Sequence, residues 1–288
     1  MERELLRLLQ PRHLLHHLRR LLTAHLLGGA VVATAIARRP PARVLERRRV
    51  AATRSPDFCA LLRAFFASVL DRYERVPYHG ALHGADVLQS AHALLIQNEA
   101  FDGSLNEDTI LVVLVAALAH DVGHPGLTNA FLVETQHELA VRYNDHSPLE
   151  NMHSRVALDL ARPWLATLDA DARKRARSTW IELVLATDMK EHAAAIFQVE
   201  HALSKDPAYD ARARANHTTC LKLLIHAADL SNPTKTWATY DRWTAKIMEE
   251  FYAQADREAE LDLPRTCLLY TSDAADEGLG VDLGGRRI

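Results

Sequence analysis

The feature that most constrains the fold is an apolar run that ends in a histidine and an aspartate. Residues 107–119 are apolar nearly all round after a polar first turn. A helix that is apolar on every side belongs in the interior of a domain, where other elements cover it. His120 and Asp121 follow directly. The run therefore predicts a rigid buried helix that presents two metal-ligating side chains at its end.

The rest of the chain also has helical periodicity. Ser55-Pro56-Asp57 is typical of a helix start, because serine caps, proline fits the first position and an acid suits the first turn. No strand-like alternation and no repeat is visible, so we expect an all-α fold. The expected helices are 55–73, 81–96, 107–119, 130–143, 148–161, 171–186, 192–203, 215–228 and 236–258.

Charge is distributed unevenly along the chain. Residues 1–50 contain eleven arginines and three glutamates, which leaves 23 basic and 34 acidic residues in 51–288. An acidic main domain argues against a nucleic-acid groove. It does not exclude a small anionic substrate, because bound metal ions reverse the local field.

The three cysteines are far apart and form no CxxC motif. This usage indicates a reducing compartment without disulfides or a cysteine zinc site, and a cytoplasmic location is expected. Residues 21–37 are mostly apolar with arginines at both edges. We interpret 1–54 as a basic segment and linker whose apolar part packs on the domain. A membrane anchor or a targeting segment remains the alternative.

The C-terminal segment differs in composition from the rest. Residues 266–288 are rich in glycine and lack helical period, and Cys267–Glu277 resembles the translation of a sequencing-library adapter. We therefore expect the natural sequence to end near Arg265 and the segment to be non-native. A native disordered tail is the alternative.

Histidines and aspartates recur around the predicted helices. His79 and His83 are four residues apart and share one helical face, and His124 lies one turn beyond His120. Asp229 ends another apolar run. A lone histidine in a helix is usually structural or exposed, so each motif alone is weak. Together and in this order they predict one metal centre assembled from several helices.

These motifs resemble the class I cyclic nucleotide phosphodiesterases. The resemblance covers about Phe58 to Pro264. Its six matched blocks are Val76–Val87, His120–Gly126, Tyr143–Asn151, Ala186–Met189, His226–Lys235 and Met248–Phe251. The first block corresponds to the family pattern PYHNxxHAADV. It implies a compact multi-helix bundle of the HD/phosphodiesterase type over residues 55–265. The implied reaction is hydrolysis of cAMP, cGMP or both to 5′-nucleoside monophosphates.

The resemblance also assigns roles at the metal centre. A zinc ion would be held by His83, His120, Asp121 and Asp229. Asp121 would bridge to a second metal, magnesium or manganese, whose other ligands are mainly waters. A hydroxide between the two metals would attack phosphorus. His79 would be the general acid that protonates the departing 3′ oxygen.

Further positions match residues around the metal-bound waters and the substrate. The first set is His124, Glu150, His153 and Asp188. The substrate set is Tyr78, His79, Met189, Asn232, Asp121 and Asp229. A structural role for His124 and Glu150, a core role for Met189 and a turn role for Asn232 remain alternatives.

The chain departs from the family pattern at several points. Gly80 replaces an asparagine, Gly123 a larger residue and Met152 a common histidine. We expect Gly80 to loosen the backbone beside His79. After Pro264 the family continues with helices that carry a purine-binding glutamine and phenylalanine. No matching segment occurs here, so we expect these helices to be missing.

Two other functional hypotheses remain open at this point. One is an HD-type phosphohydrolase that acts on another phosphoester, and the other is an inactive, truncated metal-binding fragment. The expected partner is a cyclic nucleotide, and a homodimer is a further alternative.

Overall fold

The computed structural model describes residues 55–97, 105–195, 197, 201 and 217–264. Within these ranges every regular element is a helix, as the all-α prediction required. The elements are α5 (Pro56–Arg72), α6 (Ala81–Gln97), α7 (Glu107–Ala119), α8 (Asn129–Glu134), α9 (Glu138–Arg142), α10 (Pro148–Leu165), α11 (Ala170–Leu185), η3 (Met189–Glu191), α13 (His217–Asp229), η5 (Asn232–Thr234) and α14 (Trp237–Glu260).

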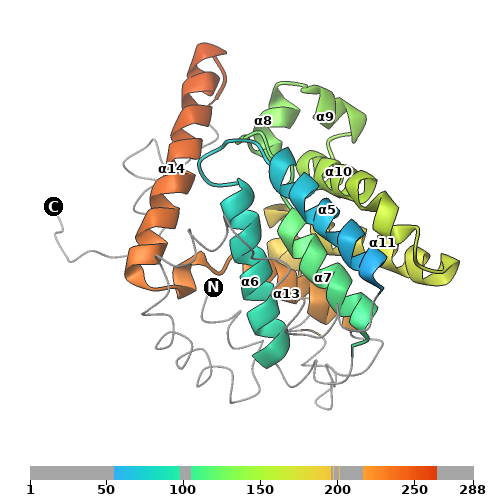
Figure 1. The fold of residues 1–288 in the computed structure, drawn as a ribbon. Coiled ribbons are helices and arrows are strands. Elements are labelled where there is room, and N and C mark those ends of the chain that lie inside the picture. Colours follow the sequence, from blue (N-terminus) through green and yellow to red (C-terminus); the bar gives the residue numbers. More distant parts are fainter. Residues whose placement is uncertain (1–54, 98–104, 196, 198–200, 202–216, 265–288) are drawn as a thin grey trace.

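Helix α7 lies at the centre of the bundle (Figure 1). Each residue from Ile110 to Ala119 is buried, which confirms the prediction of a buried helix. Helices α6, α10, α11 and α13 pack against it. An apolar surface on every side of α7 requires such cover, because any uncovered side would leave apolar area in water.

An aromatic cluster holds three of the surrounding helices together. Phe65 of α5 meets Trp164 of α10 and Trp180 of α11 edge to face, with ring centroids 6.0 and 5.9 Å apart. Both tryptophans are fully buried. Edge-to-face pairs add to the free energy gained by burying these rings, so the cluster fixes α5, α10 and α11 as one wall.

The expected helix starts are confirmed where capping residues are present. Ser55 Oγ accepts a hydrogen bond from the Phe58 amide at 3.2 Å at the start of α5. The single helix predicted over 130–143 is wrong, because the chain forms α8 and α9 instead. Thr135 Oγ1 donates to the Phe131 carbonyl, Gln136 has φ 48°, and His137 Nδ1 accepts from the Leu139 amide. Local side-chain hydrogen bonds thus replace one turn of helix.

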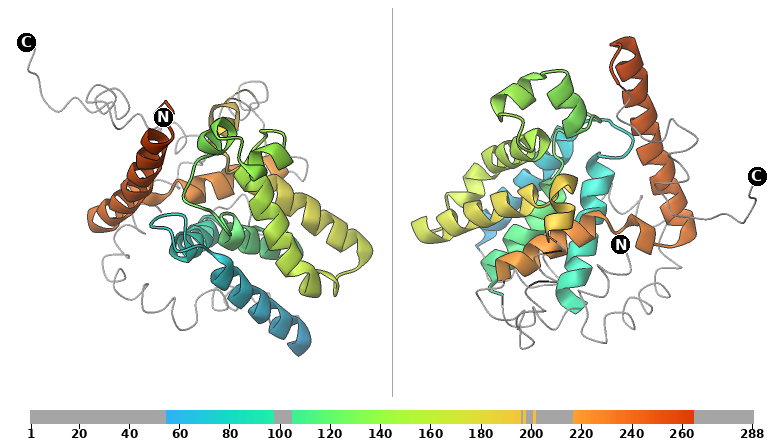
Figure 2. Two further views of the ribbon diagram at one scale, coloured as in Figure 1. Left: turned by 90° about the horizontal axis from the view of Figure 1, so that it is seen from above. Right: turned by 180° about the vertical axis from the view of Figure 1, so that it is seen from behind.

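Helix α14 extends along one side of the bundle, apart from α7 (Figures 1 and 2). Among the aromatic side chains of α14, only Trp243 is buried, and Trp237 is 76% exposed. The buried face is instead partly polar, with Glu250, Gln254 and Glu258. α14 therefore reaches the rest of the chain largely through hydrogen bonds.

Several predictions lie outside the described residues. They concern the basic segment 1–54 with its apolar part, the tail 266–288 and half of the helix expected at 192–203. The described positions 192–195, 197 and 201 of that helix are helical. Among the described helices, none has both the length and the hydropathy needed to cross a bilayer.

Candidate metal centre

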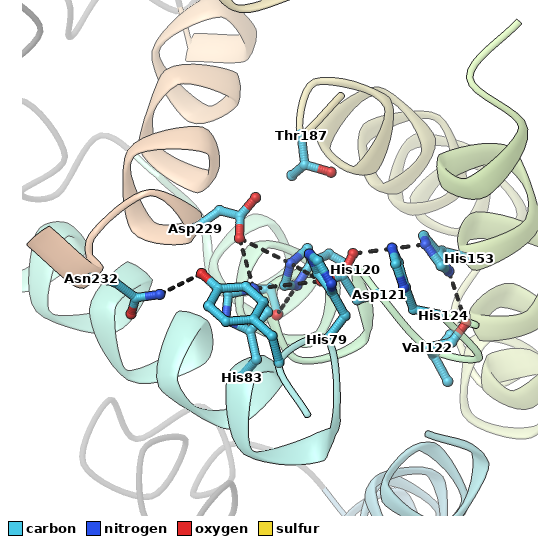
Figure 3. A network of polar contacts seen from close by, with 12 residues as sticks. His79, His83, His120, Asp121, Val122, His124, His153, Thr187, Asp229 and Asn232 are labelled. Atoms are coloured by element: carbon cyan, nitrogen blue, oxygen red, sulfur yellow. Dashed lines mark hydrogen bonds and ion pairs between the residues drawn. The ribbon is translucent and has the colours of Figure 1, made fainter. Parts of the chain in front are cut away.

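Four predicted ligands meet where three helices end or begin (Figure 3). His83 lies in the first turn of α6, His120 and Asp121 follow α7, and Asp229 is the last residue of α13. Asp229 Oδ1 lies 2.9 Å from His83 Nε2 and 3.3 Å from His120 Nε2. Asp121 Oδ2 lies 3.0 Å from His120 Nε2 and 3.5 Å from His83 Nε2. Two imidazoles and two carboxylates thus converge on one point.

The chemistry of this donor set fits a divalent metal ion. His120 Nδ1 donates to the Ala117 carbonyl at 3.0 Å, so in the neutral ring the lone pair of Nε2 faces the two carboxylates. That buried Nε2 has no well-directed hydrogen bond among the described residues. The Nε2 lone pair and the negative carboxylates repel one another, and a cation between them would remove this repulsion. Mixed imidazole and carboxylate ligands suit zinc.

The electrostatics of the cluster also call for positive charge. Burial lowers the pKa of His120, but the charges of Asp121 and Asp229 outweigh burial and raise it well above its usual value. Burial likewise raises the pKa of the Asp121 carboxyl, and His120 outweighs this and lowers it. Protons supply the compensating charge here, and a metal ion would displace them.

His79 stands beside the cluster and is held by a residue that the sequence did not single out. Glu250 Oε2 accepts from His79 Nδ1 at 2.6 Å. Its Oε1 accepts from the amides of Tyr78 and His79 at 2.6 and 2.8 Å. Burial lowers the pKa of His79, but the hydrogen bond to Glu250 and the charges of Asp121, Glu250 and Asp229 together outweigh burial and raise the net pKa. Glu250 lies in the block Met248–Phe251 that resembles the family, and this match was the one sequence feature that could have pointed to Glu250.

Two further histidines lie in line with His79. The rings of His79 and His124 are stacked, with centroids 4.0 Å apart. Burial and the charge of His79 lower the pKa of His124 well below its usual value, and its Nδ1 accepts from the Gly126 amide. His153 Nδ1 donates to the Val122 carbonyl at 2.9 Å, which turns Nε2 to within 3.7 Å of Asp121. Burial lowers the pKa of His153 to about 4. The lowered pKa values of His124 and His153 favour the neutral form of both rings.

A second pair of carboxylates lies near this row. Burial and then the charge of Asp188 raise the pKa of Glu150 to about 7. Asn129 Nδ2 donates to Glu150, and Ser147 Oγ donates to Asp188 at 2.7 Å. Asn144, Asp145 and Ser147 all have positive φ, so the loop that places these groups is strained. No sequence motif indicates this strain.

The predicted substrate residues do not share one environment. Asn232 is buried at the start of η5 and its Nδ2 donates to the Tyr78 hydroxyl, so it both begins a turn and contacts another predicted residue. The Tyr78 ring packs edge to face on Trp243. Met189 is 57% exposed, which excludes the alternative that it fills the core.

Comparison with known proteins decides the family. A model of the 3′5′-cyclic nucleotide phosphodiesterase family matches residues 78–277. The chain belongs to this family. The dual specificity calcium/calmodulin-dependent 3′,5′-cyclic nucleotide phosphodiesterase 1B of Bos taurus is 40% identical over 192 residues, which are 65% of this chain and 35% of that protein. A probable 3′,5′-cyclic phosphodiesterase of Caenorhabditis elegans is 39% identical over 210 residues, covering 71% of this chain and 31% of that protein.

Solved structures of phosphodiesterase domains agree with the fold. The phosphodiesterase domain of the RhoPDE fusion protein from the choanoflagellate Salpingoeca rosetta superposes with a TM-score of 0.75 at 31% identity, covering 83% of this chain and 76% of that one. The chain spans about a third of the length of the curated relatives it matches. In this member of the family, the cluster of His83, His120 and Asp121 could hold a metal ion.

The structure gives physical reasons for two departures from the family pattern. Gly123 has φ 78°, a conformation that glycine adopts without steric cost. Gly80 is buried, and a Cβ there would lie 3.2 Å from the Val76 carbonyl oxygen. Its amide donates to the Tyr78 carbonyl at 2.8 Å, and Glu250 binds the two preceding amides. These contacts support the backbone beside His79.

Proposed function

We propose that this chain hydrolyses 3′,5′-cyclic nucleotides, cAMP, cGMP or both, to 5′-nucleoside monophosphates. The observation that carries the proposal is the convergence of His83, His120, Asp121 and Asp229 directly beside a histidine held by a carboxylate. A metal-ligand cluster next to a positioned acid is the arrangement that phosphodiester hydrolysis needs.

We assign the metal centre to zinc, held by His83, His120, Asp121 and Asp229. A second ion, magnesium or manganese, would share Asp121. When bound, the two ions would supply charge for the phosphate oxygens and lower the pKa of bound water. The neutral rings of His124 and His153, and the carboxylates Glu150 and Asp188, would orient water molecules around the second ion.

His79 would supply the proton to the departing 3′ oxygen. Its Nδ1 is engaged by Glu250 at 2.6 Å, so Nε2 is the nitrogen that gives the proton. The raised pKa keeps the ring protonated to higher pH than a free histidine. A phosphate bound at the cluster would therefore meet a charged donor that is already oriented.

Tyr78 and Asn232 would contact the nucleotide. The hydrogen bond from Asn232 to the Tyr78 hydroxyl links the two side chains, and the Tyr78 ring centroid lies 4.6 Å from the His83 ring centroid. Asn232 Oδ1 is buried without a partner among the described residues, so it retains an unused hydrogen-bond acceptor. Met189 is exposed enough to touch a bound base.

Hydrolysis assays on the chain with zinc and magnesium test the proposal. Wild type is expected to release 5′-AMP or 5′-GMP, and Asp229→Ala is expected to lose both zinc and turnover. His79→Asn should keep zinc in stoichiometric amount and lose about 10²–10⁴-fold in turnover, the usual contribution of a general acid.

Exposed His146 offers a matched control, and His146→Asn should retain zinc and full activity. A wild-type chain that cleaves other phosphoesters but neither cyclic nucleotide would favour a different phosphohydrolase. Normal turnover in His79→Asn would remove the general-acid assignment.

A further inference from the structure

A buried tyrosine outside the ligand set contacts the end of the central helix. Tyr73 follows α5 directly and is 7% exposed. Its hydroxyl donates a buried hydrogen bond of 2.8 Å to the carbonyl of Leu118 in the last turn of α7. Leu118 is two residues before His120 and three before Asp121. The hydroxyl is thus anchored to the turn that carries two proposed ligands.

The last carbonyls of a helix have no partner within the helix and must find one elsewhere. At the end of α7, the Ala117 carbonyl accepts from His120 Nδ1 at 3.0 Å, and the Ala119 carbonyl accepts from the Val122 amide at 3.2 Å. The carbonyl between them accepts from Tyr73. The first two bonds are local to the turn, whereas the third ties the turn to a different helix.

The same hydroxyl touches the helix that carries His83. Gly84 is the next residue, and a Cβ on it would lie 2.5 Å from the Tyr73 Oη and 2.5 Å from the Leu118 carbonyl oxygen. Neighbouring atoms would have to shift to admit a Cβ here, so glycine permits this close approach. The Tyr73 hydroxyl, the Leu118 carbonyl and the Gly84 backbone therefore meet close to the candidate ligands, since Gly84 follows His83 and Leu118 precedes His120 by two residues.

The electrostatics place this hydroxyl close to the cluster. Burial raises the pKa of Tyr73 well above its usual value, and the charge of Asp121 raises it further. The group therefore stays protonated and remains a hydrogen-bond donor. A neutral donor suits a structural tie beside two carboxylates.

We propose that Tyr73 is a positioning residue of the metal centre. Its hydroxyl, admitted by the missing Cβ of Gly84, holds the His83 turn of α6 in register with the His120 turn of α7. It does not touch metal or substrate, so its effect passes through the relative placement of the ligands. The inference rests on the metal centre proposed above.

Zinc affinity of the full chain, measured by competition with a chromophoric chelator, tests the proposal. Tyr73→Phe removes only the hydroxyl and is expected to weaken zinc binding about tenfold, the scale typical for groups that orient metal ligands. Tyr143→Phe is the matched control, because its buried hydroxyl has no hydrogen-bond partner among the described residues. It should leave zinc affinity within twofold of wild type.

A role in folding alone predicts a different result. Tyr73→Phe would then lower the melting temperature of the metal-free chain while its zinc affinity stayed at the wild-type value, and this outcome overturns the proposal. A wild-type chain that binds no zinc overturns the metal centre itself. The two failures are therefore distinguishable.

A second substitution tests the pairing with glycine. Gly84→Ala should weaken zinc binding strongly in the wild-type background, because its Cβ meets the hydroxyl. The loss should be clearly smaller in the Tyr73→Phe background, where one of the two clashes is gone. Losses that simply add in the double variant would contradict the assignment of Gly84 as the space that admits the hydroxyl.

Discussion

Replacing Glu250 by glutamine should shift the pH dependence of hydrolysis without changing the shape of the site. Glutamine keeps an oxygen that can accept from the amides of Tyr78 and His79, which now lie 2.6 and 2.8 Å from Glu250 Oε1. It removes the negative charge that faces His79 Nδ1 at 2.6 Å. The substitution therefore isolates the electrostatic contribution of the carboxylate.

The size of the effect follows from burial and distance. Glu250 is 4% exposed, so water screens its charge poorly. An opposite charge this close shifts a pKa by about 1–3 units, at about 1.4 kcal/mol per unit. The carboxylate favours the protonated ring and raises the pKa of His79, so its loss lowers that pKa. At a pH above this pKa, each unit by which the pKa falls leaves about tenfold less protonated His79.

The assay is the pH profile of kcat/KM for the cyclic nucleotide that the chain hydrolyses. Activity that depends on protonated His79 is lost as pH rises through its pKa, so Glu250→Gln should move this basic limb at least about one unit lower. Glu249→Gln on the same helix is exposed and serves as the control with an unchanged profile. A wild-type basic limb in Glu250→Gln would refute the reasoning.

Three further predictions concern metal binding and stability. His83→Ala should bind no stoichiometric zinc by elemental analysis, whereas His146→Ala should bind it normally. Burial raises the pKa of Glu150 to about 7, so the folded chain keeps the Glu150 proton up to a higher pH than the unfolded chain does. The free energy of unfolding of chelator-treated protein, measured in urea, should therefore fall by about 2–3 kcal/mol as pH rises from about 4.5 to 7. Glu150→Gln should not show this fall. Trp164→Ala should cost about 3–5 kcal/mol in unfolding free energy, and Trp237→Ala, 76% exposed, about zero.

Each of these predictions has a contrary result. Stoichiometric zinc in His83→Ala would remove that ligand from the centre. An equal loss of stability with pH in Glu150→Gln would assign the pH dependence to another group. Equal costs at the two tryptophans would show that the aromatic wall between α5, α10 and α11 does not stabilise the fold.

Features that depend on neighbours along the chain were predictable from the sequence. The apolar run before His120 determined a buried helix, because no amphipathic alternative exists for such a run. The cap at Ser55 was also predictable, since it depends on residues within one turn. The break between α8 and α9 was missed, because helical periodicity over 130–143 hides the competing hydrogen bonds of Thr135 and His137.

The sequence by itself determined the candidate metal-ligating residues and the helices that carry them. Only the tertiary structure decided which groups meet, because contacts across the bundle depend on how distant helices pack. Glu250 is 171 positions from His79 and had no assigned role until α14 placed it there. The contact of the Tyr73 hydroxyl with Leu118 and Gly84 likewise depends on how three segments pack, and no local sequence pattern predicts it.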